Sequence, residues 1–271
     1  MPPHDAFARF TPYELSFPDL SQARAHFDAI RSEADARKVE VRDPSAFVML
    51  AATGQALREI RSAEDDPALI RQYGLLLFHS FHFCEEGEAL YLVEAGTLRD
   101  LLDKDPDTSG WTPSFGETAG HAAGYVQLPQ HLVWVRSEDG APPESLDGFF
   151  WVRSGADHCG FLLALGMRGE RPGFSVVDFS DLPLNEACDW SSLQAREEGG
   201  DFSSSIPGSE LEGLYELRSV GEVLKLASRV LWRIECGEGG SHGVRPVESG
   251  GSGPRASELA SRRIGRPSGA G

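Results

Sequence analysis

The chain has 271 residues, a formal net charge of −17 and a hydrophobic fraction of 40%. This apolar content is sufficient for a packed core and argues against global disorder. Duplex nucleic acid is not expected as a direct partner, because phosphate binding requires clustered lysine and arginine. The charge is typical of a soluble protein, or of one that binds a basic protein partner.

The sequence carries no recognisable signal for export or membrane insertion. Its first residues lack the basic and apolar segments of a signal peptide, and no apolar run approaches the ~20 residues that span a bilayer. The four cysteines are widely spaced, which favours buried, reduced thiols. Lysine and asparagine are scarce, which indicates a GC-rich bacterial gene. We therefore expect a bacterial cytoplasmic protein.

Residues 1–104 are predicted to form a mainly helical half. Ala23, Phe27 and Ile30 share one face of a helix over about 20–37. The next two helices begin at Asp-Pro pairs, because proline is favoured at the first helical position. They are expected from Asp43-Pro44 to Ile60 and from Asp66-Pro67 to Gly87, followed by a strand over Glu88–Glu94 and a short helix over Thr97–Lys104.

The third of these helices is expected to lie at the centre of the fold. Its Leu75–Phe78 segment is apolar on all sides of the helix. A helix that is hydrophobic all round is typically buried.

The segment Tyr125–Phe179 contains four apolar, β-branched and aromatic runs separated by Gly, Pro, Asp and Ser. This spacing is typical of consecutive strands joined by turns. Short connections favour antiparallel neighbours, so we expect an antiparallel sheet over 124–180. The predicted fold is one α+β domain over 1–236, in which the helical half packs on a sheet of about five strands.

The C-terminal part is predicted to contain helices over 207–235 that close the domain. Val220, Val223, Leu224 and Ala227 repeat at helical spacing. Residues 237–271 are rich in Gly, Ser and Arg, a composition that predicts a disordered tail.

One candidate metal site lies at the end of the third helix. His79 and His82 are three residues apart, and Glu86 follows four residues later, so the three share a helical face. Two imidazoles and a carboxylate are suitable ligands for zinc or iron. The alternative is a buried helix end, where histidine is favoured by the helix dipole.

Large aromatic residues form a candidate binding surface on the predicted sheet. Trp134, Phe149 and Trp151 lie on neighbouring strands, and alternation places Phe149 and Trp151 on the same face. Any of these rings left uncovered by helices would suit a protein partner. Cross-strand packing within the core is the alternative.

Other motifs do not indicate a reaction. Asp157-His158-Cys159 has the elements of an activated thiol, but adjacent residues of a strand point to opposite faces. We therefore interpret it as a turn followed by a core cysteine. No phosphate-binding glycine loop or nucleophile elbow is present in the sequence.

Short apolar motifs follow one another over about 125–190, namely Leu128-Pro129, Trp134, Gly148-Phe149-Phe150, Leu162–Leu165 and Leu182–Ala187. In this order they resemble the C-terminal domain of type V-A anti-CRISPR-related bacterial proteins. The resemblance implies a helical half that precedes a small antiparallel sheet. It also implies an interaction protein without catalytic chemistry, and it transfers no site residue.

Two functions are therefore predicted as alternatives. The first is a non-catalytic binding or regulatory protein that uses its acidic surface and the sheet aromatics to engage a partner. The second is a metal-dependent enzyme with zinc or iron at His79, His82 and Glu86.

Overall fold

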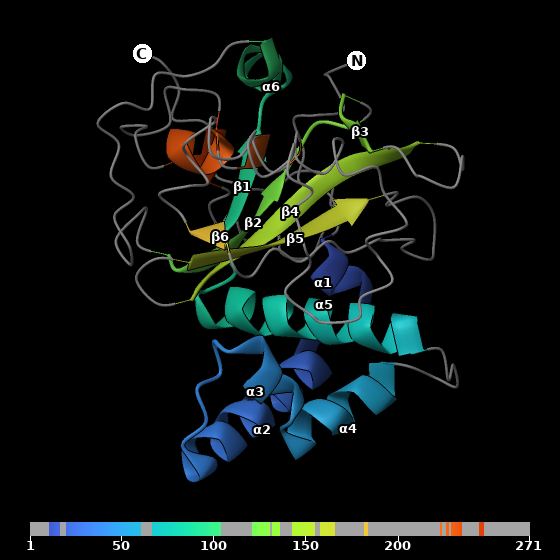
Figure 1. The fold of residues 1–271 in the computed structure, drawn as a ribbon, viewed down its shortest axis with the longest axis vertical. Helices are drawn as coiled ribbons and strands as arrows, with labels where there is room; N and C mark the ends of the chain where they lie inside the picture. Colours follow the sequence, from blue (N-terminus) through green and yellow to red (C-terminus); the bar gives the residue numbers. More distant parts are fainter. Residues whose placement is uncertain are drawn as a thin grey trace.

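A computed structural model shows an α+β fold in which a mixed sheet lies between two groups of helices (Figure 1). Helices α1–α5 cover one face of the sheet, and α6 lies on the other side. The structure describes residues 11–16, 20–60, 67–103, 121–130, 132–135, 143–154, 158–165, 182–183, 223, 226–227, 229–234 and 244–246.

The helical layer agrees closely with the sequence prediction at its first long helix. The predicted helix over about 20–37 is α2, and α5 begins at the expected proline. In Figure 1, α5 runs between the sheet and the outer helices, which confirms its central position. The helices of this layer are α1 (Pro12–Ser16), α2 (Leu20–Arg37), α3 (Pro44–Val48), α4 (Ala51–Ile60) and α5 (Pro67–Glu85).

The predicted second helix is in fact two helices. The first begins at the expected proline, Pro44, and Asp43 caps it, because its side chain accepts a hydrogen bond from the backbone N–H of Ser45 at 2.9 Å. A new helix, α4, begins only three residues after α3 ends. The Glu33 carboxylate of α2 accepts hydrogen bonds from the backbone N–H groups of Ala51 and Ala52, at 3.1 and 2.8 Å. This cap from another helix stabilises the second start.

The sheet is mixed, so the expectation of an entirely antiparallel sheet is wrong. β2, β4 and β5 form the expected antiparallel meander, but β1 pairs with β2 in parallel. A long connection that includes α6 (Ala95–Asp103) allows β2 to run in the same direction as β1. The strands are β1 (Leu90–Val93), β2 (Ala123–Gln127), β3 (Trp134–Val135), β4 (Glu144–Ser154), β5 (His158–Leu165), β6 (Leu182–Pro183) and β7 (Val244–Pro246).

The order of strands is β6-β5-β4-β2-β1-β7, and β3 also pairs with β4. The long strand β4 therefore has two successive partners along one edge. Its second half pairs with β2, and its first half pairs with β3 through Trp134 opposite Ser145. Residues 244–246 lie within the predicted tail, and they pair with β1 as an edge strand.

Two hydrophobic cores occupy the two faces of the sheet. The lower core joins α1–α5 to side chains such as Leu90, Tyr125 and Phe150. The upper core contains Phe149 and Trp151 from the opposite face of β4, which follows the expected alternation. The upper core also includes Leu98 and Leu101 of α6. Five helical residues from the C-terminal part complete it, namely Val223, Leu226, Ala227, Val230 and Leu231.

Among the described residues, no helix is long and apolar enough to cross a membrane.

Gly148→Ala should destabilise the fold, because a Cβ atom at this position of β4 would overlap the carbonyl oxygen of Val126 and the Tyr125 ring. Overpacking of this kind costs about 1–3 kcal/mol. Gly54→Ala in α4 is the matched control, since its added Cβ would come no closer than 3.7 Å to Arg58. Urea unfolding should show a gain of up to about 1 kcal/mol for Gly54→Ala. Equal effects of the two substitutions would contradict this account of the sheet.

Candidate functional site

The C-terminal half of α5 places two of the three predicted metal ligands in the interior of the molecule. Residues 74–83 of α5 are all buried, because the helix contacts the sheet on one side and the outer helices on the other (Figure 1). His79 and His82 belong to this buried stretch, and Glu86 follows the last residue of the helix.

His79 lies against the sheet and has only 1% of its surface exposed. Its ring is 5.3 Å from the ring of Phe78 and 6.2 Å from that of Phe150 on β4, measured between centroids. Neither ring nitrogen has a hydrogen-bond partner among the described residues. Burial lowers the pKa of His79 from 6.5 to about 3, with a smaller contribution from His82. The imidazole is therefore neutral at pH 7.

His82 faces the segment that joins α2 to α3. Its Nε2 atom is 3.1 Å from the carbonyl oxygen of Val41, so the neutral ring donates its Nε2 proton to that carbonyl. The ring packs against Phe47 of α3, and burial lowers the pKa of His82 to about 4. Because Nε2 carries the donated proton, this nitrogen is not available to a metal ion in this arrangement.

The Glu86 carboxylate lies at the start of β2. Its carboxylate accepts a hydrogen bond from the backbone N–H of Ala122 at 3.1 Å. Arg42 approaches the same carboxylate at 3.5 Å, and the Nδ1 atom of His121 lies 4.0 Å away. In the described part of the chain, no group of three or more His, Cys, Asp or Glu residues is placed to hold a metal ion. Zinc or iron binding at His79, His82 and Glu86 stays a prediction.

The turn after α5 is held by arginine residues that the sequence analysis did not connect with it. Glu85 pairs with Arg31, and Glu88 pairs with Arg24 at 3.2 Å. Gly87 and Glu88 both have positive φ angles, of 73° and 60°. A left-handed conformation costs a non-glycine residue roughly 1 kcal/mol or more, and the Arg24 pair helps to offset this cost at Glu88.

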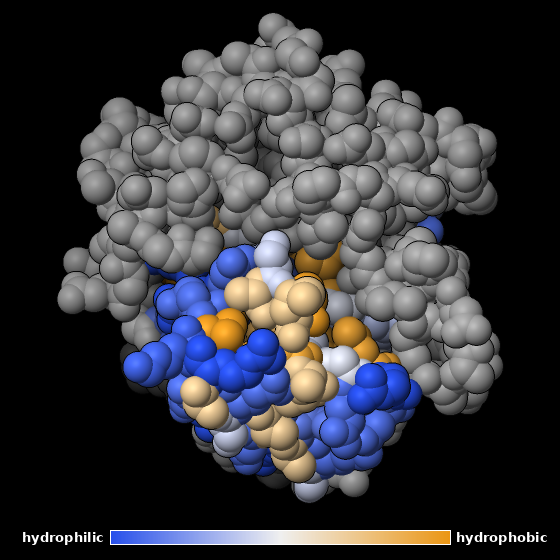
Figure 2. All heavy atoms as spheres, turned by 60° about the horizontal axis from the view of Figure 1, so that its bottom comes forward, coloured by the Kyte–Doolittle hydropathy of each residue, from blue (hydrophilic) through white to orange (hydrophobic). Residues whose placement is uncertain are grey.

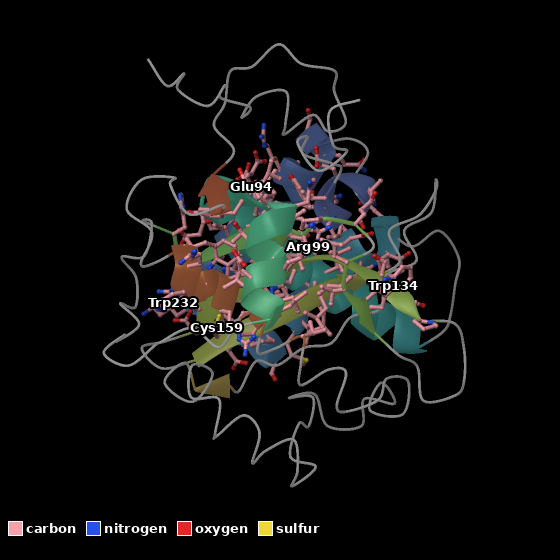
Figure 3. The ribbon with its side chains drawn as sticks, turned by 90° about the horizontal axis from the view of Figure 1, so that it is seen from above. Glu94, Arg99, Trp134, Cys159 and Trp232 are labelled. Carbon is pink, nitrogen blue, oxygen red and sulfur yellow. The ribbon has the colours of Figure 1, made fainter. Side chains whose placement is uncertain are left out.

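The three predicted binding aromatics have different environments. Phe149 and Trp151 are buried in the upper core. Trp134 on β3 is 44% exposed, and Figure 3 shows it at the margin of the described ribbon, away from Cys159 and Trp232. Of the three, only Trp134 presents its ring to solvent.

The helical layer exposes further apolar side chains, which the sequence analysis did not single out. Figure 2 shows them as an orange-toned stripe among hydrophilic residues on this face. Met49 is 75% exposed at the α3–α4 junction, next to the partly exposed Val48. In Figure 2, hydrophilic residues flank this stripe.

The described cysteines do not form an activated site. Cys159 is fully buried and its Sγ lies 3.8 Å from the carbonyl oxygen of Gly160, which confirms its interpretation as a core residue. Cys84 is a free thiol whose pKa is raised by burial and, secondarily, by the Glu88 carboxylate. A raised pKa reduces the thiolate fraction that nucleophilic chemistry requires. Cys188 and Cys236 lie outside the described residues.

No protein-family model matches the sequence, and a search of curated proteins found no match.

Glu86→Ala should destabilise the protein more than Glu85→Ala does. Loss of the Glu86 carboxylate leaves the backbone N–H of Ala122 without its acceptor, and such a loss costs about 1–3 kcal/mol. Glu85 forms a more exposed ion pair with Arg31, a type of contact worth about 0–1 kcal/mol. Urea unfolding of both variants tests this order, and the reverse order would show that the Glu86 contacts do not hold β2.

Proposed function

We propose that this protein is a non-catalytic binding or regulatory protein of a bacterial cytoplasm, and that it engages a basic protein partner. The observation that carries the proposal is the exposed ring of Trp134, at 44% of its surface, in a sheet whose other described large aromatics are buried. Tryptophan is strongly enriched among the residues that dominate binding energy at protein interfaces.

The position of Trp134 suits a binding role because its backbone is held by a long strand. Trp134 pairs with Ser145, and Val135 pairs with Glu144, in the first half of β4. The second half of β4 lies in the centre of the sheet. A ring presented from such a support loses little conformational freedom on binding, which favours affinity.

The net charge of −17 supports a partner of opposite charge. Complementary charge increases the rate of encounter and the specificity of a complex more than its final affinity. A chain with a large negative net charge and an exposed aromatic anchor therefore favours a basic protein as its partner. The resemblance to anti-CRISPR-related proteins, which implies an interaction protein, is consistent with this proposal but stays a prediction.

The finer features of the fold are also part of the proposal: a sheet of about five strands in a domain over 1–236, closed by C-terminal helices over about 207–235. Five apolar residues from this region are buried in the upper core. Their side chains would cover the face of the sheet opposite α5.

Val230→Asp tests this closure. Val230 is fully buried in the upper core, and a carboxylate without a partner there costs several kcal/mol. Thermal unfolding should therefore show a large loss of stability. Val48→Asp is the control, because Val48 is 46% exposed and should tolerate the charge. Equal stability of both variants would contradict the closing role.

Trp134→Ala should weaken partner binding by about tenfold or more, as expected for an interface residue whose truncation costs over 1 kcal/mol. Tagged wild-type protein and the variant would be used to recover partners from the native host. The dominant partner would then be purified and its affinity measured by calorimetry at two salt concentrations.

Met49→Ala is the matched control, since Met49 is also exposed but lies on the helical layer. It should leave the affinity unchanged. Equal affinities of wild type and Trp134→Ala, or a partner whose binding does not weaken with added salt, would contradict the proposed mode of binding.

A further inference from the structure

The edge of the sheet at β1 is covered by a short strand from the C-terminal part of the chain. β1 pairs with β2 on one side and with β7 on the other, and no described strand lies beyond β7. All four residues of β1 are buried. An unpaired edge on a buried strand leaves backbone N–H and C=O groups without partners, which makes it a template for another strand. The edge of β1 therefore requires a strand beside it.

The pairing of β1 with β2 determines which of its backbone groups face this edge. The backbone N–H of Tyr125 donates to the carbonyl oxygen of Ala89 at 2.9 Å. Successive residues of a strand direct their backbone groups to opposite sides, so the groups of Ala89 face β2 and those of Leu90 and Leu92 face the edge. Leu92 is opposite Arg245 of β7. This pair is therefore the one that can exchange both hydrogen bonds.

The described part of β7 uses only part of this edge. Val244 and Pro246 flank Arg245, so their backbone groups point away from β1. That orientation suits Pro246, because proline has no N–H to donate and is accepted in edge strands. The described residues of β7 do not reach Leu90. A longer segment could pair with both Leu90 and Leu92, and would therefore compete with β7 for the edge.

The strand that occupies the edge comes from a basic segment, whereas the rest of the chain is acidic. Residues 237–271 contain five arginines, three glutamates and no lysine or aspartate, so they carry a charge of +2 and the remainder carries −19. Glu94, which directly follows β1 and is labelled in Figure 3, is exposed. Arg245 places a positive charge at the centre of β7. The chemistry that fits this edge is thus an extended segment with a basic residue opposite Leu92.

We propose that β1 is an acceptor edge for an extended basic segment of a partner protein, and that β7 occupies this edge until the partner segment displaces it. Strand addition to a sheet takes its affinity from main-chain hydrogen bonds and its specificity from side chains. A tethered strand competes at an effective concentration in the millimolar range, so β7 lowers the affinity of the edge for a free segment. The acceptor edge and Trp134 lie on different strands, so this inference does not depend on the proposed function.

The test uses the full-length chain and a labelled peptide with the sequence of residues 241–247, blocked at both ends. Fluorescence anisotropy should show about tenfold or tighter binding of the peptide to the Arg245→Pro chain than to the wild type, because the substitution removes the N–H that pairs with Leu92 and releases β7. Val244→Pro is the matched control, since the N–H of Val244 points away from β1. Its affinity for the peptide should stay close to that of the wild type. Equal affinities of the wild type and Arg245→Pro would contradict the proposal.

Substitutions in the peptide distinguish strand addition from other modes of binding. With the Arg245→Pro chain as the receptor, a peptide carrying Arg245→Pro should bind about tenfold more weakly, because the Leu92 carbonyl loses its donor. A peptide carrying Arg245→Gln keeps the N–H and loses only the charge, so added salt should reduce its disadvantage. Trp134→Ala in the chain should leave peptide binding unchanged. Binding that survives Arg245→Pro in the peptide would exclude strand addition.

A second measurement uses the wild-type chain alone. When unlabelled peptide is added in excess to the ¹⁵N-labelled protein, the NMR signals of Val244 and Arg245 should move to the positions of an unstructured segment. The amide of Leu92 should stay protected from hydrogen exchange, because the peptide replaces β7. Signals of Val244 and Arg245 that do not move at saturation would overturn the proposal. Dimers of the wild type that Arg245→Pro dissociates would also overturn it, since they would assign the edge to a second copy of the chain.

Discussion

The burial of residues 74–83 of α5 between the sheet and the outer helices is the constraint on which the rest of this structure depends. A helix that lies between a sheet and other helices must bring its polar side chains into contact with protein groups rather than water. His82 meets this requirement through the carbonyl oxygen of Val41. The end of the helix meets it through the turn at residues 85–88, where arginines from α2 and from the α2–α3 segment pair with successive glutamates.

That turn also determines where the sheet begins. Glu86 binds the backbone at Ala122, immediately before β2, and the turn itself leads into β1. The turn at residues 85–88 therefore positions β1 and β2, which pair in parallel, relative to α5. β4 then links β2 to β3, because one half of β4 pairs with β2 and the other half pairs with β3. The exposed Trp134 is in this way connected to the core of the fold through one strand.

Features that depend on neighbours in the sequence were predictable. Apolar spacing located α2, the Asp-Pro pairs located the starts of α3 and α5, and the apolar run at 75–78 indicated the central helix. Features that depend on distant residues were not. The parallel pairing of β1 and β2 follows from a crossover whose path is not encoded locally. The break before α4 follows from Glu33, 18 residues earlier in the chain.

The candidate site shows the same limit. The sequence placed His79, His82 and Glu86 on one helical face, whereas the structure buries His79 against the sheet and His82 against the outer helices. Glu86 lies beyond the last residue of the helix, and its carboxylate contacts the backbone N–H of Ala122 and the Arg42 guanidinium. Alternation correctly assigned Phe149 and Trp151 to one face, but which face the helices would cover depended on the whole fold.

The cap that Glu33 provides to α4 has a consequence for the order of folding. A helix of ten residues is marginal in isolation, so α4 gains its stability only after α2 has formed and docked beside it. These two helices are close in sequence, whereas the sheet joins residues near 90, 125, 150 and 245. Because contacts that are local in sequence form faster than distant ones, the helical layer should assemble first and serve as the surface on which the strands pair.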